Sequence, residues 1–183
     1  MQPLNLSLNT LRGELLIREA GPKDAIPFRD LRLHALQDSP TAFGADYQRT
    51  LGQPSTYWED MLTIRPDEST IFVAEHESQL TGMTGIARGN SPKTRHSATI
   101  WGVYVRPEWR GLHIAQELIQ SAFNWGRARK VVAARLGVTT TNTSAIRCYE
   151  RCGFKVTGTE PRAVQYEGQY HDFYTMYCSL DNL

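Results

Sequence analysis

The stretch Ile100-Trp101-Gly102-Val103-Tyr104-Val105-Arg106-Pro107-Glu108-Trp109-Arg110-Gly111-Leu112-His113-Ile114-Ala115 decides the fold of this chain. It begins with β-branched and aromatic residues, which are typical of a strand, and a short loop with Arg110 and Gly111 then leads directly into a helix. Such a loop presents free backbone N–H groups at a helix N-terminus, where the helix dipole adds partial positive charge. The sequence therefore indicates an anion site that suits a pyrophosphate.

The helix after this loop has the clearest amphipathic pattern in the chain. Ile114, Leu118, Ala122 and Trp125 recur at spacings of four, four and three residues, which places them on one apolar face. Other strands are expected over 15–19, 70–75, 80–87, 97–105, 134–139, 154–158 and 172–179, with further helices over 24–37, 55–62 and 143–152. Asp24 is expected to cap the first of these helices. This alternation predicts a mixed α/β sheet with helices on its faces.

Outside these elements, residues 1–12 are expected to form an irregular leader, and residues 13–183 one domain. A polar and aromatic loop over 159–171 is expected to connect the last two strands. No internal repeat and no low-complexity tract interrupts the chain.

Composition and charge exclude several classes of protein. The sequence has 183 residues, of which 40% are hydrophobic and 21% charged, and its formal net charge is +1. This near-neutral balance argues against a nucleic-acid binder held by bulk electrostatics. A secretory signal and an apolar run of about 18 residues or more are both missing from the sequence, so we expect a cytoplasmic protein that does not bind membranes. Cys148, Cys152 and Cys178 lack metal-ligand spacing, so we expect free thiols and no metal.

Two motifs together resemble the GNAT superfamily of N-acetyltransferases. The six residues from Arg110 to Ala115 resemble its acyl-CoA-binding motif, Gln/Arg-x-x-Gly-x-Gly/Ala, with His113 where the family usually has glycine. Downstream, the run from Asn142 to Phe154 fits Asn-x-x-Ala-x-x-x-Tyr-x-x-x-Gly-Phe, and the likeness covers most of residues 14–180. The resemblance implies a mostly antiparallel central sheet with a splayed parallel strand pair and helices on both faces.

The resemblance also implies a site for acetyl-CoA. Its pantetheine arm would pair with the strand, its pyrophosphate would meet amides of residues 111–116, and an amide near Val103 would face the thioester oxygen. The residues expected to bind acetyl-CoA are Val103, Tyr104, Val105, Arg110, Gly111, Leu112, His113, Ile114, Ala115, Gln116 and Asn142. Asn142 could equally be a helix cap. Tyr149 is the candidate donor of a proton to the CoA thiolate, because a phenol stays protonated at neutral pH; the alternative is a packed tyrosine.

The general base is not evident from the sequence. Family members carry a glutamate where this chain has Thr99 or Gly137, and neither residue accepts a proton. Water-relayed proton removal, an acceptor that arrives partly neutral, and a base from the late loop remain as alternatives. The candidate bases in that loop are Glu160, Glu167, His171 and Asp172.

These motifs predict an enzyme that transfers an acetyl group from acetyl-CoA to a primary amine of a small molecule or peptide by direct attack. The residues expected to shape the acceptor site lie in 43–47, around Trp58 and in 159–170. Arg147 and Arg151 could approach the 3′-phosphate of the cofactor, although a solvated helix face explains them as well. The alternative function is a non-catalytic CoA-binding sensor or assembly module. A homodimer, which is common among small enzymes, stays open.

Overall fold

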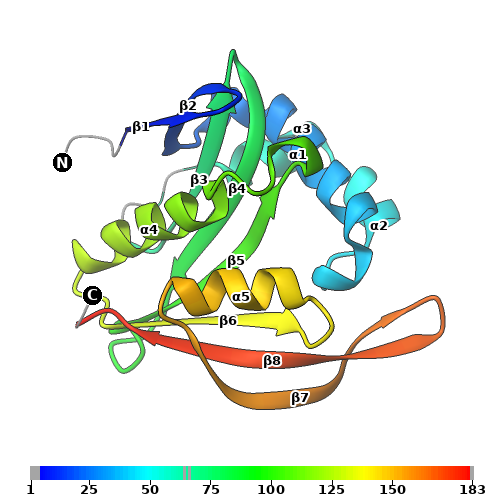
Figure 1. Ribbon diagram of the computed structural model, residues 1–183, viewed down its shortest axis with the longest axis vertical. Helices are drawn as coiled ribbons and strands as arrows, with labels where there is room; N and C mark the ends of the chain where they lie inside the picture. The colour runs from blue at the N-terminus through cyan, green and yellow to red at the C-terminus, as the bar shows by residue number, and fades with distance from the viewer. Residues whose placement is uncertain (1–4, 64, 66, 182–183) are drawn as a thin grey trace.

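The computed structural model describes residues 5–63, 65 and 67–181 and is built on one eight-stranded sheet (Figure 1). The strand order is β1-β2-β3-β4-β5-β6-β8-β7. Every neighbouring pair is antiparallel except β5 and β6, which are parallel. The strands are β1 Leu6–Thr10, β2 Gly13–Glu19, β3 Ser69–His76, β4 Gln79–Arg88, β5 Ser97–Val105, β6 Ala133–Thr139, β7 Lys155–Tyr166 and β8 Gln169–Ser179.

Helices cover both faces of this sheet, as the sequence predicts. One face carries α4 and α5, and the other carries α1 and α3, so the hydrophobic core is divided into two clusters. The α-helices are α1 Ala25–Asp38, α2 Tyr47–Leu51, α3 Ser55–Met61, α4 Ile114–Arg127 and α5 Thr143–Arg151, with short 3-10 turns η1 Pro22–Asp24, η2 Pro40–Ala42 and η3 Pro107–Trp109. None of the helices in the described part of the chain is long and apolar enough to cross a membrane.

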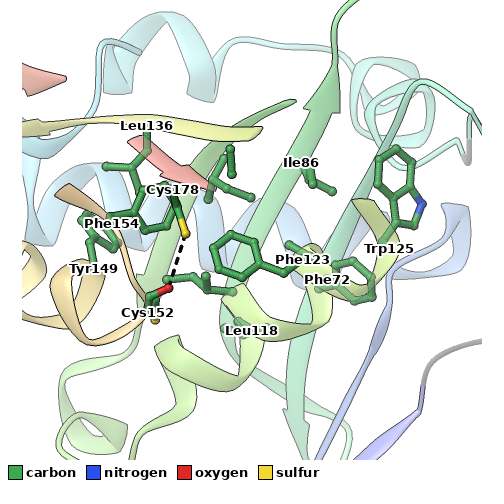
Figure 2. Close-up of a cluster of buried hydrophobic side chains, with 14 of the residues drawn as sticks. Phe72, Ile86, Leu118, Phe123, Trp125, Leu136, Tyr149, Cys152, Phe154 and Cys178 are labelled. Carbon is green, nitrogen blue, oxygen red and sulfur yellow. Dashed lines mark hydrogen bonds between the residues drawn. The ribbon is translucent and has the colours of Figure 1, made fainter. Parts of the chain in front are cut away.

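The cluster beneath α4 and α5 fixes these helices on the sheet (Figure 2). Phe154, directly after α5, stacks with Phe123 of α4 at 5.6 Å and with Tyr149 of α5 at 6.1 Å between ring centroids. The Cys178 thiol donates to the Cys152 carbonyl oxygen at 3.7 Å, and all three cysteines are free. Burying each large apolar side chain stabilises the fold by about 1.5–3 kcal/mol. The packing of these side chains therefore holds α4 and α5 in fixed positions on the sheet.

The two central strands separate along their length. Residues 97–99 of β5 pair with residues 133–135 of β6, and the ladder between the two strands then stops. From there β5 pairs only with β4, and β6 only with β8. Two unpaired strand edges therefore face each other, which confirms the splayed parallel pair.

A β-bulge in β5 accompanies this separation. Met83 of β4 pairs with Tyr104 of β5, and Gly85 pairs with Trp101. Two residue steps on β4 therefore face three on β5. The extra residue coincides with Gly102, whose φ is 66°. A bulge bends its strand and increases the local twist, and glycine adopts a left-handed φ without the steric penalty of a Cβ. The bulge lies just beyond the point at which the ladder between β5 and β6 stops.

Three segments differ from the sequence predictions. The leader is not irregular throughout, because Leu6–Thr10 form β1 and pair with β2; residues 1–4 lie outside the described residues. Helix α2 was not expected; its N-cap is Asp46, whose carboxylate accepts a hydrogen bond from the Arg49 amide at 2.7 Å. Residues 159–171 belong to a long hairpin rather than a loop: Glu167 and Gly168 turn with φ of 47° and 77°, as in tight hairpin turns with two positive φ angles.

Asp24 lies at the start of α1 but does not cap it with its side chain. Its carboxylate accepts hydrogen bonds from the Arg18 guanidinium at 2.8 Å and the Gly21 amide at 2.9 Å, and Arg18 also binds Glu75 at 2.7 Å. Burial alone would raise the pKa of Asp24, but these bonds outweigh it and hold that pKa below its usual value. The cluster joins β2, β3 and α1.

Candidate active site

A cavity of about 370 Å³ lies where β5 and β6 separate. Its walls are the free edges of the two strands, the loop before α4, the start of α4 and one face of α5. Every residue expected to bind acetyl-CoA lines it except Leu112, which is partly buried and packs against the core. Tyr149 lines it as well. Residues from two motifs about 30 positions apart in the sequence are thus brought to one place.

The edge of β5 offers backbone groups for a ligand to pair with. Beyond residue 99 no hydrogen bond joins β5 to β6 among the described residues, and Val103, Tyr104 and Val105 all border the cavity. The Val105 carbonyl is the exception, because it accepts a hydrogen bond from Arg110 Nε at 3.1 Å. An extended ligand can add to such an edge as a further strand.

The loop before α4 forms a set of unpaired donors. Within the described part of the chain, the backbone amides of residues 111–115 donate to no protein group. Gly111 makes this possible with a φ of 80°. Gln116 differs from expectation, because its amide already donates to the His113 carbonyl at 3.0 Å. Free amides at a helix N-terminus are the type of group that binds anions, and here they number one fewer than the sequence predicts.

His113 takes a left-handed conformation at the N-cap of α4, with φ 61° and ψ 9°. This conformation is uncommon for residues with a Cβ, although histidine adopts it more often than most. Its exposed imidazole makes a short hydrogen bond through Nδ1 with Gln116 Oε1. A residue with a side chain therefore occupies a left-handed backbone conformation that favours glycine.

Arg110 is held by α1 rather than left free for a phosphate. Its guanidinium pairs with the Asp38 carboxylate at the end of α1 and lies 5.6 Å from the centre of the Tyr104 ring. The Tyr104 hydroxyl is 2.8 Å from His34 Nδ1. Burial and then the charge on Asp38 raise the pKa of Tyr104 to about 12. This network fixes the loop against α1 and was not predicted, because its partners lie 70 and 72 residues apart.

Tyr149 presents a protonated hydroxyl at the cavity. The residue is 8% exposed, and its ring packs edge-on against Phe154. Burial, with smaller effects from Cys148 and Cys152, raises the pKa of Tyr149 above its usual range. No other described residue forms a hydrogen bond with its hydroxyl. The tyrosine is thus packed by its ring and free at its oxygen.

Asn142 has one of its two expected roles, because it caps a helix. Its side-chain oxygen caps α5 by accepting from the Ala145 amide at 3.2 Å, and it also accepts from the Ser144 hydroxyl at 3.0 Å. Because Asn142 also lines the cavity, its side-chain NH₂ group is available to a ligand. Arg151 lines the cavity too, whereas Arg147 is exposed elsewhere on α5.

The residues considered as general bases do not gather at the cavity. Glu160, Glu167, His171 and Asp172 are not among the residues that line it, and Asp172 accepts a hydrogen bond from the Arg162 amide at 2.8 Å. Within the described ranges 5–63, 65 and 67–181, no group of three or more His, Cys, Asp or Glu side chains is arranged to hold a metal ion.

The segments expected to bind the acceptor are placed unevenly. Phe43 lines the cavity, as do Ala42 and Trp101, which the sequence did not single out for this role. Trp58 belongs instead to the core between α1 and α3, where it is 1% exposed, and residues 159–170 contribute no cavity wall. Of the segments considered for the acceptor, only the one that begins at Phe43 reaches the cavity, beside η2 and the bulged part of β5.

Comparison with known proteins places the chain among acetyltransferases. The profile of the Acetyltransferase (GNAT) family matches residues 32–154. The L-amino acid N-acetyltransferase of Escherichia coli (strain K12) is 28% identical over 169 residues, which cover 90% of this chain and 97% of that protein.

Solved structures share the fold at lower identity. A GNAT-family acetyltransferase from Streptococcus pneumoniae superposes with a TM-score of 0.80 at 24% identity, covering 90% of this chain and 98% of that one. A putative acetyltransferase from Salmonella typhimurium, solved with its cofactor acetyl-CoA, gives a TM-score of 0.75 at 20% identity, covering 92% and 95%.

Proposed function

Because the chain belongs to the GNAT family of acetyltransferases, and is therefore an acyltransferase, we propose that it transfers an acetyl group from acetyl-CoA to a primary amine. The observation that carries the proposal is the cavity between the separated strands, which places unpaired strand edges next to the free amides of residues 111–115. An extended arm with a pyrophosphate at its end fits this pair of features.

The acceptor is proposed to be a small-molecule amine, with a peptide amine as the less favoured option. The E. coli relative is named for its action on L-amino acids, which supports a small acceptor here. The acceptor side of the cavity, with Phe43 and Trp101, also offers aromatic surface to a compact molecule.

The proposed reaction is direct attack of the neutral amine on the thioester carbon. A C–N bond forms, the C–S bond breaks, and CoA leaves as a thiolate that takes up a proton. A strand amide near Val103 is proposed to stabilise the developing oxyanion; losing a comparable donor costs about 3 kcal/mol of transition-state stabilisation. Tyr149 is proposed to supply the proton, which its free hydroxyl at the cavity supports; its raised pKa keeps the phenol protonated but does not make it a stronger acid.

Removal of the amine proton is proposed to run through water, or to precede binding. The acidic residues of the β7–β8 hairpin do not border the cavity. An amine with a pKa near ~10 is mostly protonated at neutral pH, so turnover with such an acceptor should rise with pH in this range.

The decisive experiment is calorimetric titration of the protein with acetyl-CoA, beside the His113→Gly variant. We expect micromolar binding by both proteins, since the amides of residues 111–115 are free in the presence of His113. A screen of primary amines for CoA release then tests catalysis. No binding by the native protein, with binding restored by the variant, would show that the imidazole blocks the cradle.

A non-catalytic CoA-binding module is the competing outcome. It predicts acetyl-CoA binding without CoA release for any amine in the screen. Release that is lost in Tyr149→Phe would exclude such a module.

A further inference from the structure

Arg32, in the second half of α1, is partly exposed, but one nitrogen of its guanidinium is cut off from solvent. This nitrogen, Nη1, is buried and makes no hydrogen bond. Among residues 5–63, 65 and 67–181, none forms an ion pair with Arg32 or accepts a hydrogen bond from it. The Phe43 ring lies against the guanidinium, 4.7 Å from Cζ to the ring centre. Burial lowers the pKa of Arg32, with a smaller opposing effect from the Tyr57 hydroxyl.

Such an arrangement is unfavourable unless something else satisfies the guanidinium. Buried charges in proteins are almost always paired, because desolvation removes the hydration of the charge without replacing it. A cation–π contact with Phe43 offsets only part of that loss. Two other arginines show the contrast, since Arg110 is paired with Asp38 and Arg18 with Asp24 and Glu75.

The position of Arg32 relates it to the acceptor side of the cavity. A methyl group placed on Gly102 would lie 3.5 Å from Arg32 Nη1, so the guanidinium abuts the β5 bulge. Gly102 and Phe43 both line the cavity, whereas Arg32 is not itself a lining residue and lies directly behind these two, so a ligand reaches the guanidinium only past them. Arg32 lies on the face of the sheet that carries α1, opposite the α4 face on which the free amides of residues 111–115 lie.

We propose that Arg32 binds the carboxylate of the acceptor and that the acceptor is therefore an α-amino acid. This inference rests on the proposed acetyl transfer. A guanidinium presents parallel N–H donors that match the two oxygens of a carboxylate. Polyamines and other purely cationic acceptors would be repelled.

The separation between Arg32 and the proposed position of the thioester carbon favours an acceptor whose amine is close to its carboxylate. Gly102 precedes Val103, whose amide is proposed to face the thioester oxygen. Because Arg32 abuts the strand at Gly102, a carboxylate on Arg32 leaves a short distance to the reacting carbon. An α-amine spans this distance, whereas the side-chain amine of a lysine would be carried past it. Phe43 and Trp101 supply apolar surface for the side chain of the amino acid.

The test compares acceptors with and without the carboxylate. Each proteinogenic L-amino acid is assayed for CoA release, and the best one is compared with its primary carboxamide in the native protein, Arg32→Gln, Arg32→Lys and Arg29→Gln. Removing one partner of a buried charge pair typically changes affinity by about 30-fold or more. We expect Arg32→Gln to lower kcat/KM by about this factor for the amino acid, through KM, and by less than about threefold for the carboxamide.

The controls separate binding of the carboxylate from general effects. Arg29 lies one turn earlier on α1 with a side chain that is 37% exposed, so Arg29→Gln should leave both acceptors unaffected. Arg32→Lys keeps the positive charge and should therefore retain part of the preference for the amino acid over its carboxamide. If Arg32→Gln fails to fold, calorimetry on the native protein decides: the N-acetyl amino acid should bind about 30-fold more tightly than its carboxamide.

Three results would overturn the role of Arg32 while leaving acetyl transfer intact. The first is equal turnover of the amino acid and its carboxamide by the native protein, and the second is an equal loss for both acceptors in Arg32→Gln. The third is turnover of polyamines or peptides alone. Absence of both acetyl-CoA binding and CoA release would instead count against the proposed function itself.

Discussion

The two ends of the β5–β6 pair serve different purposes. At one end, residues 97–99 and 133–135 form a regular parallel ladder whose side chains include the buried Ala98 and Ala134. At the other end, the same strands are apart, and their edges border a cavity of about 370 Å³. The paired end resembles the interior of any parallel sheet, whereas the open end leaves backbone donors and acceptors without protein partners.

The difference shows how a small local change creates a site. One additional residue in β5, at Gly102, accompanies the loss of pairing. The open end then exposes groups that a folded protein normally satisfies, and it is stable because both strands keep their outer partners, β4 and β8. Substitutions at the paired end should therefore change stability, and substitutions at the open end should change ligand binding and turnover.

The largest effect is expected for Tyr149→Phe, at the open end. Loss of a proton donor lowers rates by about 100-fold or more, so kcat should fall by about this factor while acetyl-CoA affinity, measured by calorimetry, stays within about twofold of native. An unchanged kcat would assign Tyr149 to packing alone.

The pH dependence of the same tyrosine provides a second measurement. Its folded-state pKa is raised above the ordinary value near ~10, so the phenol remains a proton donor through the range in which a free tyrosine begins to ionise. The kcat of the native enzyme should therefore show no alkaline decline below about pH 10. A decline at lower pH would mean that another group controls the rate.

The next largest effect is expected for Ala98→Leu, at the paired end. Ala98 is 3% exposed and packed in the core beneath α4, so a larger side chain should destabilise the fold by about 1–3 kcal/mol. Denaturant unfolding measures this loss. The kcat of the folded variant should stay close to native, and a large loss of kcat without loss of stability would contradict the division between the two ends.

A smaller effect is expected for Gly102→Ala. With φ at 66°, a Cβ adds about 1 kcal/mol of backbone strain, and relief of this strain by straightening the bulge would move the edge that acetyl-CoA is proposed to pair with. We expect lower unfolding free energy together with several-fold weaker acetyl-CoA binding. Gly158→Ala is the control, since nothing lies within 4 Å of the added carbon and φ is not positive there.

The smallest effect is expected for His113→Gly compared with Lys130→Gly. Both residues have a φ of 61°, and Lys130 does not line the cavity. Removing the Cβ should raise the unfolding free energy of each variant by up to about 1 kcal/mol. Only His113→Gly should also alter the affinity for acetyl-CoA; an equal change in both variants would show that the imidazole does not matter to the cofactor.

Much of the architecture could be predicted from local patterns. The helices α1, α3, α4 and α5 carry apolar residues at helical spacing, and the strands β3 and β5 are rich in β-branched and aromatic residues. The β7–β8 hairpin was predicted only at its ends, because most of β7 is exposed and has no buried face to impose alternation. The strand β1 is short and half-exposed, so its pattern is weak.

The parts of the site that come from contiguous sequence motifs could be predicted. The parts that come from contacts between residues far apart in the sequence could not. The loop from Arg110 to Ala115 and the helix after Asn142 are local signals, and both reach the cavity. The contributions of α1 are not local. His34 meets Tyr104 across 70 residues, and the isolation of Arg32 is visible only once its surroundings are known.

The short parallel ladder also has a consequence for how the chain folds. The strands β3, β4 and β5 follow one another in sequence as antiparallel neighbours, and β7 and β8 form a hairpin, so both groups can form early from nearby contacts. Joining them requires residues 97–99 to meet residues 133–135 across α4, which is a slower closure of the chain. Until then, each group has a bare strand edge that a second molecule can occupy. Refolding yield should therefore fall with protein concentration, and a ligand that pairs with these edges should raise it.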